Sequence, residues 1–178
     1  EALRGRDENG VYTRAVDLSR DLHHIEAVLD KTNGCRLLVI DPLTAYLGKT
    51  DSHKNAEIRS LLAPLAELAS RRGVAVLAVT HLRKGAGPAI YRSMGSLAFA
   101  AAARAVWAVA KDKDNEKRRL VLPVKNNIAS DSSGLAYSVE SSKDTGAPVV
   151  VWELTQMLLM TDDALTVDRT EDDHDDGE

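Results

Sequence analysis

The sequence has little cysteine and few aromatic residues, and both shortages limit what the protein can be. Its one cysteine, Cys35, has no partner for an intramolecular disulfide and excludes a cysteine-rich zinc site. A cytoplasmic, reducing compartment is therefore expected. Aromatic residues make up only 4% of the chain, so an aromatic side chain among bases in a loop is a candidate for a specific role.

The sequence also lacks an apolar run long enough to cross a bilayer. The most apolar long stretch, Leu97–Ala110, is interrupted by Arg104 and falls short of the roughly 20 residues required. We therefore expect no membrane contact. Residues Glu1–Asn9 have no signal-peptide core and the chain starts without methionine, so we expect an internal fragment or a processed product.

The formal net charge of −4 is unevenly distributed. Residues Thr161–Glu178 carry nine acids and one base, which is typical of a disordered tail because such a segment has little apolar area to bury. Residues Arg83–Lys125 carry ten bases and three acids. That excess is either a solvated basic face or a contact for an anionic partner.

Hydrophobic periodicity in the first half predicts a parallel βαβ unit. Helical spacing runs over Val16–Lys31, with Asp17 or Ser19 as the cap and Gly34 as the stop. Leu37–Ile40 is a short apolar run, typical of a strand buried on both faces of a parallel sheet. A crossover helix over Ala56–Arg72, closed by Gly73, leads to a second strand, Val74–Val79.

The second half predicts a short helix and two hairpins. Ser93–Ala103 is rich in alanine and favours a helix. The alternating patterns that follow predict two hairpins, Ala105–Ala110 with Arg119–Val124 and Leu135–Glu140 with Pro148–Leu154.

Polar residues follow both predicted parallel strands at their carboxyl ends. Asp41 comes directly after the first strand, and Thr80 and His81 follow the second. Ligands of open α/β sheets bind at this edge, where Asp41 could hold magnesium through water. The alternatives are an aspartate that caps the next loop and a structural histidine.

The tripeptide Gly48-Lys49-Thr50 imitates the end of a phosphate-binding loop. That loop requires a glycine five residues earlier, where this chain has Leu43. We therefore reject a phosphate-binding role for the tripeptide, and no other Gly-x-x-x-x-Gly-Lys-Ser/Thr occurs in the chain.

Five blocks in this order resemble the RepA-type hexameric helicase ATPases of the RecA-like superfamily, which are related to AAA-family ATPases. They are Leu37–Gly48, Ala63–Ala69, Val79–Lys84, Tyr91–Ser96 and Val124–Asn127. The resemblance implies an α/β fold, a RecA-like three-layer core with a mostly parallel sheet and C-terminal β-hairpins. It places an N-terminal segment at 1–15, the C-terminal half of the ATPase domain at 16–155 and an acidic tail at 156–178.

The resemblance also implies roles, partners and cofactors. Asp41 matches the Walker B aspartate, which would bind Mg with ATP; His81 matches the polar sensor, and Thr80 lies beside them. Lys125 and Arg92 are competing candidates to reach a neighbouring subunit's nucleotide in a homo-oligomer, a hexameric ring. The loop Arg83–Ser96 would face single-stranded DNA through Arg83, Lys84, Tyr91 and Arg92.

The chain departs from this family in one important respect. It contains neither the Walker A loop nor the acid that orients the attacking water, so we expect this chain alone to be inactive as an ATPase. The main hypothesis is part of an ATP-hydrolysing ring that acts on DNA. The alternatives are a nonenzymatic DNA- or protein-binding module, or an ATPase of the same superfamily that acts in recombination or signalling without unwinding.

Overall fold

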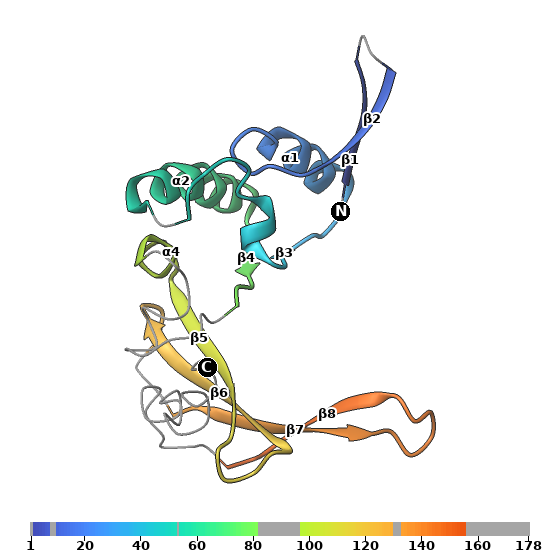
Figure 1. Ribbon diagram of the computed structural model, residues 1–178, viewed down its shortest axis with the longest axis vertical. Helices are drawn as coiled ribbons and strands as arrows, with labels where there is room; N and C mark the ends of the chain where they lie inside the picture. Colours follow the sequence, from blue (N-terminus) through green and yellow to red (C-terminus); the bar gives the residue numbers. More distant parts are fainter. Residues whose placement is uncertain (1, 8–9, 53, 82–96, 130–132, 156–178) are drawn as a thin grey trace, which may run out of the picture. The chain divides into compact units, whose positions relative to one another are not determined.

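A computed structural model of the chain describes residues 2–7, 10–52, 54–81, 97–129 and 133–155 (Figure 1). The chain divides into two compact units. Unit 1 comprises Glu1–Leu82 with Met94–Ala102, and unit 2 comprises Arg83–Ser93 with Ala103–Glu178. Each unit has its own cluster of buried apolar side chains.

Unit 1 opens with an antiparallel hairpin of β1 (Ala2–Asp7) and β2 (Gly10–Ala15). Gly10 begins β2 with a φ of 114°, a backbone conformation that glycine adopts without steric cost. No secondary structure was predicted for residues 1–15, so the hairpin is a new finding.

Helix α1 spans Leu22–Lys31 and begins six residues later than the periodicity predicted. Residues 16–21 instead form a turn in which the backbone N–H of Asp17 donates to the carboxylate of Asp21, 2.8 Å away. Neither predicted cap is used, because Asp21 is the N-cap residue and its side chain makes no capping hydrogen bond.

The predicted βαβ unit is present. Strand β3 (Leu37–Ile40) pairs in parallel with β4 (Ala75–Ala78), in the register Leu37↔Ala75 to Ile40↔Ala78. Helix α2 (Asn55–Arg72) connects them with Pro64 inside it, and it ends at Gly73 in the left-handed conformation with φ 61°. A short 3-10 helix, η1 (Leu43–Tyr46), follows β3 and was not predicted.

The core of unit 1 lies on one side of the β3–β4 pair only. Ile40 joins a cluster that includes Leu43, Ile58 and Leu65, and Phe99 of α4 (Leu97–Ala102) completes it. Leu37 and Val39, whose side chains point the other way, are 53% and 52% exposed. The prediction that this strand is buried on both faces was therefore wrong for this chain, because the described helices pack on one face.

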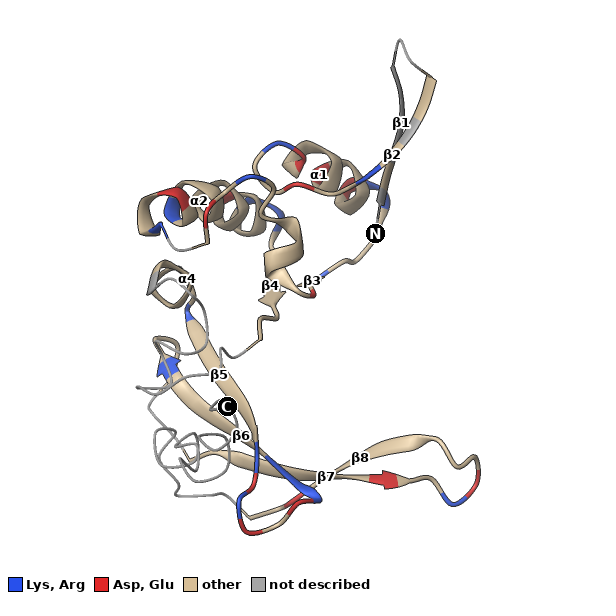
Figure 2. Ribbon diagram, viewed as in Figure 1, with Lys and Arg blue, Asp and Glu red and all other residues tan. Residues whose placement is uncertain are grey.

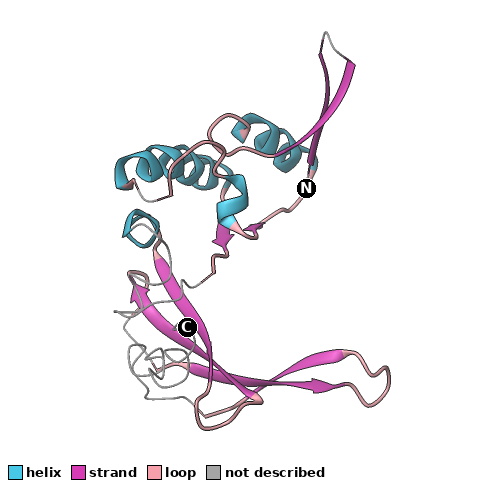
Figure 3. Cartoon of the chain, viewed as in Figure 1, coloured by secondary structure: helices cyan, strands magenta, loops and turns pink. Residues whose placement is uncertain are grey.

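Unit 2 is a four-stranded antiparallel sheet in the order β5-β6-β7-β8 (Figure 3). Its strands are β5 (Ala105–Lys111), β6 (Arg118–Asn126), β7 (Leu135–Ser141) and β8 (Pro148–Trp152). Both predicted hairpins are confirmed. Pairing of β6 with β7 joins them into one sheet, and Leu120, Leu122 and Ala136 form its buried cluster.

The fold class is α/β, with one parallel and two antiparallel sheets among the described residues. The RecA-like three-layer core and the boundaries at 16–155 stay predictions, and the predicted tail 156–178 lies entirely outside the described residues. None of the described helices is long and apolar enough to cross a membrane.

Candidate nucleotide edge of the parallel strands

The carboxyl ends of β3 and β4 meet at one edge of the parallel sheet, as the sequence predicted. Ile40 is the register partner of Ala78, and the N–H of Val79 donates to the Ile40 carbonyl over 2.9 Å. The N–H of Leu43 then donates to the Val79 carbonyl over 2.8 Å. These bonds hold the chain segments that carry Asp41 and Thr80 side by side.

The polar side chains at this edge are accessible. Asp41 and His81 are exposed and Thr80 is half-buried. No hydrogen bond or ion pair joins the Asp41 carboxylate to another residue in the described part of the chain. Asp41 is linked to Pro42 by a cis peptide bond, after which the chain turns into η1.

This edge fits a magnesium ion that arrives with a phosphate better than a metal held by protein alone. Among the residues that the structure describes, no three His, Cys, Asp or Glu side chains gather into a group that could hold a metal. Magnesium keeps several waters and binds proteins through one or two carboxylates plus substrate phosphates. One exposed carboxylate, Asp41, matches that second arrangement.

The tripeptide Gly48-Lys49-Thr50 has a structural explanation. Gly48 adopts a φ of 62°, and a Cβ atom placed on it would overlap the carboxylate of Asp17. The glycine therefore allows this carboxylate to approach the backbone closely. A carboxylate at this place also disfavours a bound phosphate, which agrees with the rejection of a phosphate-binding loop here.

Residues 5–87 match a family described as an AAA domain. The match supports an AAA-like P-loop ATPase family. No curated protein matches the chain. The AAA-domain match includes Asp41, Thr80 and His81, and it ends before Arg92 and Lys125.

The other predicted site residues lie in unit 2 or outside the described residues. Lys125 is in β6, and its ammonium group donates to the carbonyl oxygen of Ala103 over 2.7 Å. A role in reaching another subunit would require this bond to open. Four predicted residues lie outside the described residues: Arg83, Lys84, Tyr91 and Arg92.

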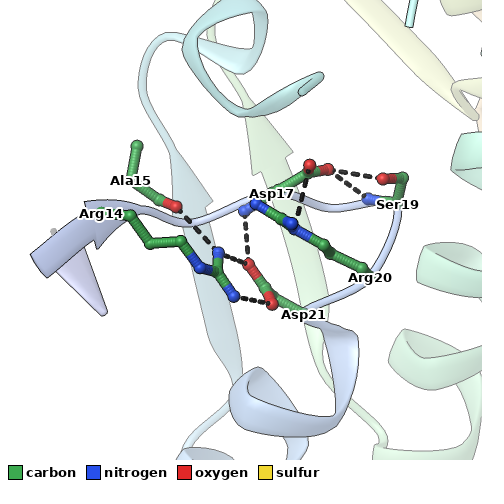
Figure 4. A network of polar contacts seen from close by, with 6 residues as sticks. All are labelled: Arg14, Ala15, Asp17, Ser19, Arg20 and Asp21. Atoms are coloured by element: carbon green, nitrogen blue, oxygen red, sulfur yellow. Dashed lines mark hydrogen bonds and ion pairs between the residues drawn. The ribbon is translucent and has the colours of Figure 1, made fainter. Parts of the chain in front are cut away.

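A polar network beside α1 was missed by the sequence analysis (Figure 4). Asp21 is 1% exposed, and both of its carboxylate oxygens accept hydrogen bonds from the Arg14 guanidinium, one over 2.7 Å. Asp17 accepts from the backbone N–H and the hydroxyl of Ser19. No local pattern reveals the Arg14–Asp21 pair, because it joins the end of a hairpin to the start of a helix.

The Arg14 guanidinium holds the pKa of Asp21 well below its usual range, and this effect exceeds the opposing effect of burial. The carboxylate is therefore ionised at neutral pH. We interpret the network as structural, since it fixes the hairpin to the N-terminal end of α1 within the AAA-domain match.

Two clefts of unit 1 lie beside this network, and Asp41 lines neither of them. One cleft, of about 590 Å³, is lined by Leu18, His23 and Pro64 among others. The other, of about 570 Å³, is lined by Asp17 and Lys49 among others. Arg20 and Glu57 line both clefts, and each already has an ion-pair partner. Arg20 lies 3.3 Å from Asp17, and Glu57 lies 2.9 Å from Lys54. These clefts therefore give no indication of a ligand's charge.

Replacing Gly48 tests the structural explanation of the Gly-Lys-Thr tripeptide. Gly48→Ala is expected to lower the free energy of unfolding by about 1–2 kcal/mol for the left-handed backbone. The overlap with the Asp17 carboxylate should add about 1–3 kcal/mol. Urea unfolding followed by circular dichroism measures the sum of these two costs.

Gly34→Ala is the matched control, since Gly34 has a φ of 72° and no atom within 4 Å of an added Cβ. It carries only the backbone cost. Equal destabilisation in the two variants would show that Asp17 does not constrain position 48.

Proposed function

We propose that this chain is part of an ATP-hydrolysing, ring-forming RecA-like ATPase that acts on DNA, similar to a replicative helicase of phage or mobile elements. The observation that carries the proposal is the edge where Asp41 and Thr80–His81 follow two parallel strands that are paired in register. The AAA-domain match over these same residues supports it.

Within the proposal each residue at the edge has a distinct role. The exposed Asp41 carboxylate orients metal-bound water, and Thr80 and His81 offer hydrogen bonds to phosphate oxygens or to the attacking water. When bound with ATP, Mg²⁺ neutralises negative charge that develops on the phosphates. A longer protein that contains this chain would supply the phosphate-binding loop.

A ring would bring a cation of one subunit to the nucleotide of the next. Lys125 and Arg92 are the candidates, because charge stabilisation of a transferring phosphoryl group is worth a large factor in rate. Lys125 would exchange its bond to the Ala103 carbonyl for a phosphate oxygen. Turnover of Asp41→Asn, described in the Discussion, tests the proposed function.

The proposed DNA contact is the loop Arg83–Ser96, whose bases flank Gly85 and Gly87 and whose Tyr91 offers a ring for stacking. Arg83→Ala combined with Lys84→Ala should weaken binding of single-stranded DNA and flatten its salt dependence by about two units at most. Tyr91→Ala should cost roughly 1–3 kcal/mol if a base stacks there.

Fluorescence anisotropy of a labelled oligonucleotide at several salt concentrations measures these effects on protein matched for oligomeric state. Lys143→Ala, which removes one cation from the β7–β8 turn, is the control for a lost surface charge. Binding equal to wild type at every salt concentration would exclude this loop as the DNA contact.

A further inference from the structure

The sheet of unit 2 has one face that is buried over β5 to β7 and exposed at β8, and an opposite face that carries both tryptophans. Side chains alternate between the faces along each strand, and Ala108, Leu122 and Ala136 are buried on one of them. Trp107 and Trp152, on the other face, are 42% and 53% exposed. They are the only two tryptophans in the sequence. We call this exposed side of β5–β8 the aromatic face.

One row of side chains crosses the aromatic face from β5 to β8. The strand register pairs Lys111 with Arg119, Arg119 with Tyr137, and Tyr137 with Trp152. The rings of Tyr137 and Trp152 have their centroids 5.2 Å apart and are tilted by 55°. Because neighbouring strands lie about 4.8 Å apart, the two cations stand roughly 5–10 Å from the strand that carries Tyr137.

The charge on the aromatic face is positive. None of the described strand positions on this face is acidic. Asp112 and Glu153, which directly follow Lys111 and Trp152 in the sequence, are both held by Arg118, at 2.8 Å and 2.6 Å. Figure 2 shows bases and acids together where β5 ends and β6 begins.

Neither cation of the row forms an ion pair with another residue in the described part of the chain. Arg119 donates from a single guanidinium nitrogen to the carbonyls of Glu116 and Arg118, which leaves its other nitrogens for an anion. Lys111 is exposed at the end of β5. An apolar protein surface laid over the row would desolvate both cations without pairing them, which is costly.

We propose that the aromatic face binds single-stranded nucleic acid. Bases stack on the Tyr137–Trp152 pair and on Trp107, and Lys111 and Arg119 hold the phosphates. Stacking on aromatic side chains beside a cationic path is how single strands are bound without sequence preference. This contact is separate from the loop Arg83–Ser96 and requires neither ATP nor magnesium.

Both tryptophans lie on the proposed surface, so intrinsic fluorescence reports on it directly. Oligothymidylate of about 16 nucleotides is titrated into the full 178-residue chain without nucleotide or magnesium. We expect tryptophan emission to be quenched in a saturable way. The apparent affinity should fall with salt by about 0.7 in logarithmic slope for each phosphate held.

Variants of Tyr137 and Lys111 test whether the row is the binding surface. Tyr137→Ala is expected to raise Kd roughly ten-fold through the lost stacking, whereas Tyr137→Phe keeps the ring and should bind as wild type. Lys111→Ala should lower the salt slope by about 0.7. Lys113→Ala, an exposed lysine in the adjoining turn, is the matched control and should leave Kd and slope unchanged. Circular dichroism confirms that each variant is folded.

Any of the following outcomes would overturn the proposal. One is the absence of quenching at low salt. Another is quenching with the same Kd and slope in Tyr137→Ala and Lys111→Ala, or binding lost only in the Arg83→Ala/Lys84→Ala variant. The third is a concentration-dependent dimer that shifts tryptophan emission without DNA, which would assign the face to a second copy of the chain.

The assay also separates this proposal from the proposed ATPase. The titration contains neither ATP nor magnesium, so its outcome does not depend on turnover at the candidate edge. Failure of the ATPase proposal would therefore leave this binding unaffected. A failure of binding would likewise say nothing against turnover.

Discussion

Asp41→Asn is expected to lower magnesium-dependent ATP hydrolysis by about 10- to 100-fold in a protein that joins this chain to a phosphate-binding loop. The change keeps the shape of the side chain and removes a charge aimed at the metal. Asp41 is exposed at the end of β3, so its replacement should not disturb packing. Nucleotide binding should change much less than turnover, because the phosphate-binding loop supplies most of the phosphate contacts.

Steady-state hydrolysis measured across a magnesium titration tests this expectation. Asp114→Asn, an equivalent change in the β5–β6 turn, is the control for a lost surface charge and should turn over as wild type. The 178-residue chain by itself is expected to give no turnover above buffer. Equal turnover of Asp41→Asn and wild type would instead favour a nonenzymatic binding module in which Asp41 has no catalytic role.

Asp21→Ala is expected to lower the free energy of unfolding by about 2–3 kcal/mol. Removing one partner of a fully buried ion pair costs about 3–5 kcal/mol, and the Arg14 side chain is 29% exposed, which reduces the cost. The variant also leaves the N–H of Asp17 without its 2.8 Å acceptor. Urea unfolding followed by circular dichroism measures the difference.

The same pair predicts a pH dependence. Because the pKa of Asp21 is lower in the folded state than in the unfolded chain, its stabilisation is fully present above the unfolded pKa of about 4. It is lost as pH falls below that value, when the unfolded chain binds the proton more readily. The wild type should lose stability between about pH 5 and pH 2 more steeply than Asp21→Ala.

Asp30→Ala is the control for these measurements, since Asp30 pairs with Arg72 at 2.6 Å on an exposed surface. Exposed pairs contribute about 0–1 kcal/mol. A cost for Asp21→Ala no greater than that for Asp30→Ala, or parallel acid profiles of wild type and Asp21→Ala, would mean that the network does not secure α1.

Several elements were predictable because a local pattern decides them. The apolar run Leu37–Ile40 formed a strand with the predicted bounds, and Gly73 ended α2 because glycine adopts the left-handed conformation there. The two hairpins followed from alternation on either side of a polar turn. Their physical cause lies within a few residues, so the order of residues is enough to reveal it.

Other features depended on residues far apart in the chain. Helix α1 begins at Leu22 and not at the predicted Val16. Arg14 and Asp21 pair across the turn that precedes the helix, and no periodicity encodes that pair. The open side of β3 was mispredicted because an apolar run is the same whether one or both of its faces are covered. What covers a face is decided by other segments.

At the candidate edge, the order of residues and the tertiary structure each decided a different feature. The sequence by itself determined that Asp41 and Thr80–His81 follow apolar strands, and that a βαβ connection would make those strands parallel. Only the tertiary structure decided the register Ile40↔Ala78, which holds the two polar segments together. Likewise, the registers of three strand pairs, β5–β6, β6–β7 and β7–β8, aligned Lys111, Arg119, Tyr137 and Trp152 in one row, because register is set by hydrogen bonds between strands that the order of residues leaves open.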